Sequence, residues 1–353
     1  MRHGSARGKA GEDVHTIGAV DIDRQVLVVA EIGNNHEGDR GLAEELIGRA
    51  AEAGAGAVKL QAIRPERLVR GDQAERLAQL RRLCLAVEDL EHLAGVAKAA
   101  GVLFLATPFD VDAVALLDPW VPAFKVASGD NDFVALLEAV GATGKPVLLS
   151  TGGTDLAGVR RAIATLESGF EASGAGTKRH PLLVLLHCVS AYPTPPDQAN
   201  LRAITSLAAL GHPVGYSDHT LGIEAAVLAV ALGARVVEKH FTLSKTHSTF
   251  RDHQLSADPR EMKDLVARVR EVELLLGDGV KRIMEAERGV VAAARRSIVA
   301  VRDLEAGRTL SRRDLDWLRP GDGLPPEATS RLLERRLRRP VAAGRPLSLD
   351  DVE

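Results

Sequence analysis

Short apolar runs, each ending in polar residues, recur along most of this chain. The first run covers residues 26–30 and is followed directly by Glu31. Continuous apolar runs of this length are typical of strands buried on both faces, as in a parallel sheet covered by helices. Segments with helical character separate the runs, and several end in glycine, as residues 40–53 do before Gly54. The pattern therefore predicts strands that alternate with helices.

Eight strands of this kind precede His240. They cover residues 26–30, 57–61, 102–106, 123–127, 146–149, 182–186, 213–216 and 235–238. A helical segment follows each strand closely, except the second, which is followed by a longer insertion rich in arginine and leucine. Eight such repeats predict a closed (β/α)8 TIM barrel, an α/β fold. A doubly wound open sheet is the alternative, but residues 33–36 lack the glycine-rich turn expected after its first strand.

The character of the sequence changes after the eighth helix, which we expect over residues 259–276. The elements that follow Arg295 are short strands and turns. A run of arginines over residues 331–339 contains leucines on one side, so we expect a short amphipathic helix there. The expected organisation is a flexible N-terminal tail (1–20), a barrel (21–280), a linker (281–294) and a small, mostly β domain (295–353).

Composition excludes several classes of partner. The 353 residues are 45% hydrophobic and 26% charged, as in an ordinary globular protein. A formal net charge of -3 and an aromatic content of 3% argue against nucleic-acid binding. No apolar run is long enough to cross a bilayer, and the N-terminus lacks a signal peptide's apolar core. Cys84 and Cys188 lack ligand spacing and suit free thiols in a reducing cytoplasm. We expect a cytoplasmic protein that binds neither nucleic acid nor membrane.

Polar residues stand at the carboxyl ends of the predicted strands, where barrel enzymes place their chemistry. They are Glu31, Lys59, Gln61, Thr107, Lys125, Ser128, Ser150, Thr151, Ser190, Tyr192, His219 and His240. Each buried charge needs a partner, so charged groups at so many strand ends indicate a functional site. Two lysines and several hydroxyls suit an anionic ligand, either a phosphate or a carboxylate.

Two histidines follow the seventh and eighth strands. We expect His219 and His240 to lie side by side, where a pair of imidazoles can hold a divalent metal that polarises a carbonyl oxygen. Glu31 can act as a general base towards water. Three interpretations of these residues stay open at this point. They are addition to a carbonyl with a phosphorylated co-substrate, metal-dependent aldol cleavage, and two unrelated structural histidines.

The residues also form motifs that resemble those of the sialic acid synthases and the related legionaminic and pseudaminic acid synthases. The matching motifs, in the family's order, cover residues 30–38, 58–61, 107–109, 125–129, 149–152, 187–188, 192–194, 217–222 and 238–242. Residues 296–298 and 319–323 resemble the antifreeze-like (SAF) β-clip domain that ends these enzymes. The resemblance covers the chain from Val26 to its last residue, and so many motifs in one order are highly specific.

The resemblance implies condensation of phosphoenolpyruvate with the open-chain form of an N-acylated hexosamine. The products would be a nine-carbon 2-keto acid and phosphate. A metal-dependent aldolase or lyase acting on a 2-keto acid sugar is the alternative, and a non-catalytic carbohydrate-binding protein is a second one. By resemblance, the catalytic residues are Glu31, Lys59, His219 and His240. The two histidines would hold a divalent cation, with Mn²⁺ preferred over Mg²⁺ or Co²⁺.

The resemblance also divides the remaining site residues between the two substrates. Thr107, Lys125, Ser128, Ser190 and Ser217 match positions around phosphoenolpyruvate. Gln61, Asp130, Tyr192, Asp252 and Arg319 match positions on the sugar side. In the family the C-terminal domain crosses to the other subunit, so the resemblance implies a domain-swapped homodimer.

Departures from the family pattern fall on the sugar side. Phe250 and Arg251 replace the usual Gly-Pro before Asp252, and Asp130 stands where many members have glutamate. Arg251 either meets an extra anionic group or forms a salt bridge within its own loop. We therefore expect intact metal and phosphoenolpyruvate sites beside an altered sugar site.

Overall fold

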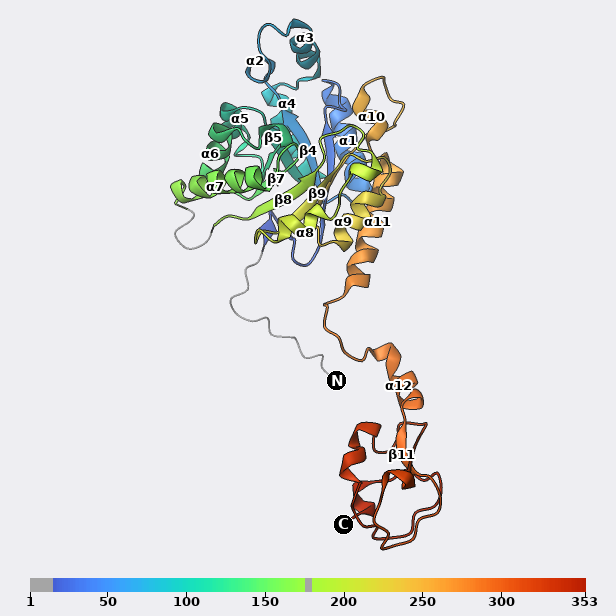
Figure 1. Cartoon of the computed structure of the whole chain (residues 1–353). Helices are drawn as coiled ribbons and strands as arrows, with labels where there is room; N and C mark the ends of the chain where they lie inside the picture. The colour runs from blue at the N-terminus through green and yellow to red at the C-terminus, as the bar shows by residue number, and fades with distance from the viewer. Residues whose placement is uncertain (1–14, 175–179) are drawn as a thin grey trace. The chain divides into compact units, whose positions relative to one another are not determined.

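A computed structural model, shown in Figure 1, describes residues 15–174 and 180–353 of the chain. It divides into two compact units, one ending at Gly277 and the other covering Asp278–Glu353. In the first unit, parallel strands close into a barrel in the order β10-β3-β4-β5-β6-β7-β8-β9. The predicted (β/α)8 barrel is therefore confirmed. No helix in the described ranges is both long enough and apolar enough to cross a membrane.

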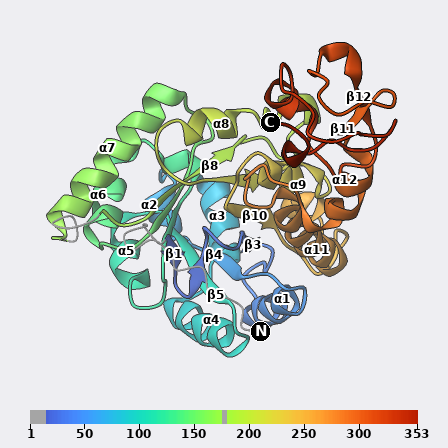
Figure 2. The same cartoon turned by 90° about the horizontal axis from the view of Figure 1, so that it is seen from below.

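Each predicted strand corresponds to one strand of the barrel. The strands are β3 (Leu27–Gly33), β4 (Ala57–Ala62), β5 (Leu103–Pro108), β6 (Phe124–Val126), β7 (Val147–Ser150), β8 (Leu183–Cys188), β9 (Val214–Asp218) and β10 (Val236–His240). The covering helices are α1 (Arg40–Glu52), α4 (Val87–Ala99), α5 (Val111–Leu117), α6 (Val134–Ala142), α7 (Leu156–Ala172), α8 (Ala203–Ala208), α9 (Glu224–Ala231) and α11 (Pro259–Leu276). Figure 2 shows these helices around the strands.

Two segments extend this plan. Helices α2 (Pro65–Leu68) and α3 (Ala74–Leu83) form the insertion between β4 and α4, and α10 (Arg251–Leu255) lies between β10 and α11. Figure 1 shows α2, α3 and α10 at the same end of the barrel. This is the end at which the carboxyl termini of the strands open into the cavity described below.

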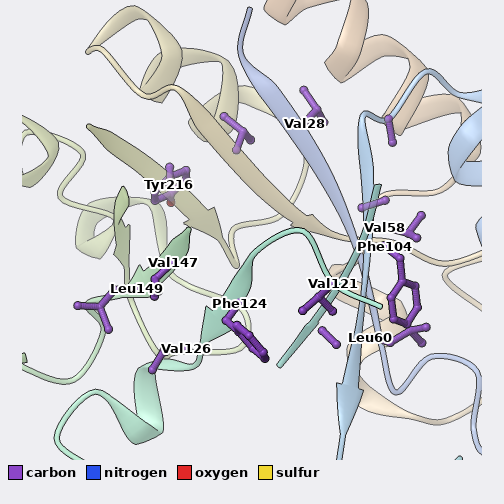
Figure 3. Close-up of a cluster of buried hydrophobic side chains, with 14 of the residues drawn as sticks. Val28, Val58, Leu60, Phe104, Val121, Phe124, Val126, Val147, Leu149 and Tyr216 are labelled. Carbon is purple, nitrogen blue, oxygen red and sulfur yellow. The ribbon is translucent and has the colours of Figure 1, made fainter. Parts of the chain in front are cut away.

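Side chains alternate between two faces along each strand, which separates two apolar clusters. Val28, Val58 and Phe124 belong to the large cluster between the strands and the helices, part of which is shown in Figure 3. Leu27 and Val29 belong to a second cluster, inside the barrel. Four of the covering helices, α1, α5, α7 and α11, begin at an aspartate that caps the first turn; in α11 the Asp258 carboxylate accepts a hydrogen bond from the Glu261 N–H.

The barrel interior changes from apolar to polar along the strands. The lower layer is formed by Val29, Ala57, Leu105, Ala123, Leu148, Leu186, Gly215 and Val236. Two residues further along the same strands stand Glu31, Lys59, Thr107, Lys125, Ser150, Cys188, Ser217 and Glu238. A Cβ atom on Gly215 would lie 2.4 Å from Leu186 Cδ2 and 2.5 Å from the Val236 carbonyl oxygen, so this position requires glycine. The alternation of side chains along the strands thus places a layer of polar groups directly above an apolar layer.

A short hairpin packs against this apolar layer. Strand β1 (Thr16–Ile17) pairs antiparallel with β2 (Val20–Asp21), and Ile17 and Ile22 are fully buried in the same cluster as Leu27. Residues 15–20, which we expected in a flexible tail, include this hairpin and bury Ile17 against the barrel. The rest of the expected tail, residues 1–14, lies outside the described residues.

The second unit contains a repeated element. Its strands β11 (Ser297–Ala300) and β12 (Leu315–Leu318) pair antiparallel. Residues 306–314 and 343–351 share the pattern Ala-Gly-Arg-x-Leu-Ser-x-x-Asp. Each copy ends in a 3₁₀ turn, η5 (Arg312–Asp314) or η7 (Leu349–Asp351), whose final aspartate is fully buried. The small, mostly β domain predicted at the C-terminus is confirmed.

Two stretches of the second unit differ in secondary structure from what the sequence predicted. Residues 281–294, the expected linker, contain the 3₁₀ turn η4 (Glu285–Glu287) and the helix α12 (Arg288–Ala294), with no buried side chain in either. Residues 331–339 do not form the predicted helix. They follow η6 (Pro326–Arg331) as turns, and Leu337 pairs with Val352 in an isolated bridge. The leucines are buried by this bridged packing rather than on one side of a helix.

Candidate active site

A cavity of about 1070 Å³ opens at the carboxyl ends of the barrel strands. Among its lining residues are the predicted site residues Glu31, Lys59, Gln61, Thr107, Lys125, Ser128, Tyr192, Ser217, His219, His240 and Asp252. The structure therefore gathers these side chains, which come from seven of the barrel strands and the loops after them, around one space.

Three predicted site residues do not line this cavity. Ser190 lies just beyond it, since a Cβ atom on Gly152 would be 2.5 Å from Ser190 Oγ and 2.7 Å from Ser128 Oγ. Asp130 ends the 3₁₀ turn η1 (Ser128–Asp130), and burial together with the charge of Asp132 raises its pKa to about 6. Arg319 is exposed and belongs to the second unit.

Four buried charged groups form a cluster on the cavity floor. Lys59 Nζ lies 2.8 Å from Glu31 Oε2 and 3.9 Å from Glu238 Oε2. Lys125 Nζ lies 3.6 Å from Glu238 Oε1. Each residue is at most 5% exposed, so the two lysines and two carboxylates neutralise one another away from bulk water.

Burial and neighbouring charges shift the pKa values of this cluster in different directions. Burial, reinforced by the charge of Glu238, raises the pKa of Glu31 despite the opposing effect of Lys59. Burial also lowers the pKa of Lys125. At Glu238 burial is outweighed by the two lysines, which lower its pKa. Glu31 is therefore the carboxylate of the pair that accepts a proton more readily.

Hydrogen bonds from neutral groups orient the cluster. Thr107 Oγ1 accepts from Lys59 Nζ at 3.1 Å, and Ser217 Oγ donates to Glu238 Oε1 at 2.9 Å. Gln61 Nε2 donates to Glu31 Oε1 at 3.0 Å. Because these partners come from different strands, the positions of the charges depend on the closed barrel rather than on any local turn.

The two histidines lie beside this cluster. The His219 and His240 ring centroids are 5.5 Å apart, and the Tyr192 ring lies 4.1 Å from that of His219. His219 Nδ1 lies 2.8 Å from the Val189 carbonyl oxygen, so it donates there and leaves Nε2 as a free electron-pair donor. His240 Nδ1 is buried without a hydrogen-bond partner in the described residues. Burial also lowers the pKa of His240 well below its ordinary value, which keeps this imidazole neutral.

Two imidazoles placed in this way fit a divalent cation as part of its coordination shell. Across residues 15–174 and 180–353, no group of three or more His, Cys, Asp or Glu side chains is arranged to hold a metal. A cation at His219 and His240 would therefore take its remaining ligands from water or substrate oxygens, as cations in open catalytic sites do.

An ion pair supports the two histidines from behind. Asp218 and Lys239, the residues immediately before them, are partners in the β9–β10 register, and Lys239 Nζ lies 2.9 Å from Asp218 Oδ2. Asp218 Oδ1 also accepts from the N–H and the hydroxyl of Thr220, each at 2.8 Å. Both charged side chains are buried. This network ties together the two strand ends that carry the imidazoles.

Several lining residues were not predicted from the sequence. Glu238 stands two residues before His240, and strand alternation alone places both side chains on one face, so a signal was present. Cys188 is the buried free thiol that was expected, but its place in the cavity wall, with Sγ 3.8 Å from His219 Nδ1, was not predicted. Arg76 and Arg82 also line the cavity, but their position there depends on how the insertion folds, which no sequence pattern predicts.

Comparisons with known proteins agree with this geometry. The NeuB family model matches residues 46–281, and the SAF domain model matches residues 295–353. The N,N'-diacetyllegionaminic acid synthase of Legionella pneumophila is 38% identical over 93% of this chain and 94% of its own length. The N-acetylneuraminate-9-phosphate synthase of Mus musculus is 34% identical over 85% of each chain.

A solved structure is also similar to this chain in both sequence and fold. The crystal structure of the N-acetylneuraminic acid (sialic acid) synthetase from Leptospira borgpetersenii, in complex with citrate, is 34% identical to this chain. It superposes with a TM-score of 0.72 and covers 78% of this chain and 94% of its own. The family match, the curated relatives and the barrel lead to one conclusion: this chain belongs to the NeuB family and carries a C-terminal SAF domain.

Proposed function

We propose that this protein condenses phosphoenolpyruvate with the open-chain form of an N-acylated hexosamine, giving a nine-carbon 2-keto acid and phosphate. The observation that carries the proposal is the floor of the cavity, where two buried lysines, two carboxylates and a pair of imidazoles meet. The alternative is an aldolase or lyase acting on a 2-keto acid sugar. The relatives described above are named as synthases, which favours condensation.

The lysines suit the anionic co-substrate. Lys125 Nζ has the Val126 carbonyl oxygen at 3.2 Å and Glu238 only at 3.6 Å, so it keeps capacity to donate to a ligand. Lys59 adds a second ammonium group. The hydroxyls of Thr107, Ser128 and Ser217 line the cavity, Ser190 lies next to it, and all four can supply short donors to phosphate or carboxylate oxygens.

The sugar aldehyde belongs next to the histidines. A divalent cation held by His219 and His240, with Mn²⁺ the first expectation and Mg²⁺ or Co²⁺ the alternatives, supplies a Lewis acid for the aldehyde oxygen when it is bound. Tyr192, Gln61 and Asp252 line the cavity beside this position and suit the sugar hydroxyls. Asp130, which does not line the cavity, follows Ser128 in the turn η1, and the resemblance alone assigns it to the sugar side.

The bond changes assign one role to Glu31. The C3 carbon of phosphoenolpyruvate bonds to the aldehyde carbon through the electron pair of the C2=C3 double bond. The aldehyde oxygen becomes a hydroxyl by gaining one proton of the water that adds at C2, and the second proton of that water leaves with the phosphate. Water then adds at C2, phosphate leaves with the electron pair of the C2–O bond, and C2 becomes the keto carbon. Glu31, whose pKa burial raises, accepts the proton released by that water. Lys59, 2.8 Å away, holds the carboxylate in place.

A direct assay tests the proposal. The protein is incubated with Mn²⁺, phosphoenolpyruvate and a panel of N-acylated hexosamines, and phosphate and 2-keto acid are measured together. We expect phosphate release that depends on the sugar and equals the keto acid formed. Absence of phosphate across the whole panel would refute condensation, and release of pyruvate from a sialic-type acid would support the lyase instead.

We further propose a cytoplasmic, domain-swapped homodimer in which Arg319 of one subunit reaches the N-acyl group bound in the other. The support is the match of residues 295–353 to the SAF domain and the family motif at residues 319–323. Mixing two inactive variants, His219→Ala and Arg319→Ala, tests this arrangement. A swapped heterodimer regains one intact site, whereas activity that stays absent after subunit exchange would exclude the swap.

A further inference from the structure

The outer part of the cavity is lined by guanidinium groups from two segments that are far apart in the sequence. Arg76 and Arg82 belong to α3, within the insertion, whereas Arg251 begins α10. Figure 1 shows both helices at the mouth end of the barrel. The charged floor described above lies deeper, so the cavity has an inner and an outer set of cations.

Helix α3 presents its arginines through its own periodicity. Leu77, Leu80 and Leu83 are buried and anchor the helix. Arg76, Gln79 and Arg82 recur at intervals of three residues and all line the cavity. Arg76 Nη1 donates to Gln79 Oε1 at 2.6 Å, which holds the Arg76 side chain along this face.

The loop between β3 and α1 fixes both helices relative to the cavity. Gly38 has a φ of +84°, and a Cβ atom there would lie 2.2 Å from the Arg82 carbonyl oxygen, so the loop backbone touches the end of α3. The preceding residue, Glu37, lies 3.0 Å from His253 Nε2 of α10. One loop therefore buttresses the segments that carry Arg82 and Arg251.

The arginines of the insertion differ in their partners. Those facing away from the cavity pair with carboxylates: Arg64 and Arg67 with Asp112, Arg70 with Asp72, and Arg81 with Glu66. Arg76 and Arg82 have no carboxylate partner within residues 15–174 and 180–353. The unpaired guanidinium groups of this insertion are thus the two that face the cavity.

Arg251 connects the outer cations to the inner site. Its Cζ lies 5.1 Å from the centroid of the Tyr192 ring, which in turn packs on His219. Its ion pair is with the adjacent residue, Asp252, at 3.2 Å, and its side chain is 67% exposed. The guanidinium group is therefore held near the sugar site while most of its donors stay available.

We propose that the acceptor sugar carries an anionic group, a phosphate ester or a carboxylate, at the end remote from its aldehyde, and that Arg76, Arg82 and Arg251 bind this group. The inference rests on the proposed function. An aldehyde placed at His219 and His240 directs the other end of an open-chain sugar outwards, towards these arginines. Phosphoenolpyruvate has its own cations in Lys59 and Lys125, and guanidinium groups suit phosphate and carboxylate equally.

The test compares matched sugars and matched variants. With Mn²⁺ and saturating phosphoenolpyruvate, kcat/KM is measured for N-acetylmannosamine, its 6-phosphate and the corresponding 6-carboxylate (uronate). We expect the wild type to favour one anionic sugar over the neutral sugar by about a hundredfold or more, and the preferred sugar identifies the anion. The double substitution R76Q/R82Q should lower this ratio by at least about tenfold, the loss typical of charge-assisted hydrogen bonds. The control R81Q alters the same helix at an arginine paired with Glu66, and it should keep the ratio.

Three results would each overturn the inference while leaving the proposed function intact. The first is that the wild type uses the neutral sugar at least as well as both anionic ones. The second is that R76Q/R82Q reduces kcat/KM equally for all sugars, and the third is that it raises the KM for phosphoenolpyruvate. If no sugar releases phosphate, the proposed function fails, and calorimetric titration of the same sugars then decides the inference. Binding of an anionic sugar that R76Q/R82Q abolishes supports it, and no preference for an anionic sugar overturns it.

Discussion

Both compact units of this protein bury charged side chains, but they satisfy them differently. In the second unit, Asp314 and Asp351 are fully buried, and each accepts hydrogen bonds from the N–H and the hydroxyl of a serine three residues earlier in the chain. Their arginine partners come from the neighbouring turns and are partly exposed. Oδ2 of each aspartate is therefore bound within its own turn, and Oδ1 is paired with arginines at the edge of the unit.

The barrel cluster has no such local support. Glu31 and Glu238 take their partners from Lys59, Lys125, Gln61 and Ser217, each on another strand. The comparison teaches how to separate structural from functional charges. A buried carboxylate bound by its own backbone stabilises a turn, whereas charges that neutralise one another across a cavity can exchange partners with a ligand.

The largest effect should follow from removing a barrel lysine. Lys59→Met leaves Glu31 with a poorly compensated buried charge and removes an ammonium group from the proposed phosphoenolpyruvate site. We expect kcat/KM to fall by about 10²–10³-fold, the scale found for loss of one well-placed donor. The matched change in the second unit is Arg345→Met, because Arg345 Nη2 lies 3.5 Å from Oδ1 of the structural carboxylate Asp351. It should alter kcat/KM by less than about threefold. If steady-state assays showed the same loss of kcat/KM for both variants, the distinction between functional charges in the barrel and structural charges in the second unit would be refuted.

A buried histidine outside the cavity, His36, should make the stability of the barrel depend on pH. Burial lowers the pKa of His36 to about 4. Between that value and the ordinary pKa of about 6.5, the unfolded chain binds a proton that the folded barrel excludes, so stability is lost as the pH falls through this window. The loss is of the order of 3 kcal/mol below pH 4. Urea unfolding of the barrel at pH 7 and pH 4.5 measures it, and His36→Gln should show a smaller pH dependence. Parallel pH curves for the two proteins would contradict the buried, neutral state of His36.

The turn carboxylates should matter for stability alone. Asp314→Ala removes the hydrogen bonds from Ser311, and we expect the second unit to lose about 1–3 kcal/mol of local stability. Hydrogen exchange of residues 297–318, followed by mass spectrometry, measures this loss unit by unit. The barrel amides serve as the internal control, because their protection should not change. Loss of protection throughout the barrel would show that the two units do not respond independently.

The smallest expected effect concerns the ion pair behind the histidines. Asp218→Asn weakens the tie between the strand ends that carry His219 and His240. We expect Mn²⁺ binding, measured by calorimetry without substrates, to weaken by about tenfold, as for other residues that orient metal ligands. Lys239→Met should have a similar effect, and the double variant should lose less than the sum of the two. Strict additivity would mean that the pair does not act as a unit.

The sequence was most informative where side chains alternate along buried strands. Its continuous apolar runs predicted every barrel strand, and the polar residues that end them predicted the floor of the cavity. Glu238 was missed although the same alternation that places His240 also places it. The hairpin that buries Ile17 in the apolar layer of the barrel could not be predicted, because two-residue strands are too short to produce a pattern. Arg76 and Arg82 were beyond prediction, since their role depends on the tertiary position of α3.

The central claim, that water attacks C2 while phosphate departs, is tested most directly with phosphoenolpyruvate labelled with ¹⁸O at its bridging oxygen. With the wild-type protein, Mn²⁺ and an accepted sugar, we predict that the ¹⁸O appears in the released phosphate and that release stops when the sugar is omitted. Label retained in the 2-keto acid, or phosphate released without sugar, would contradict the account.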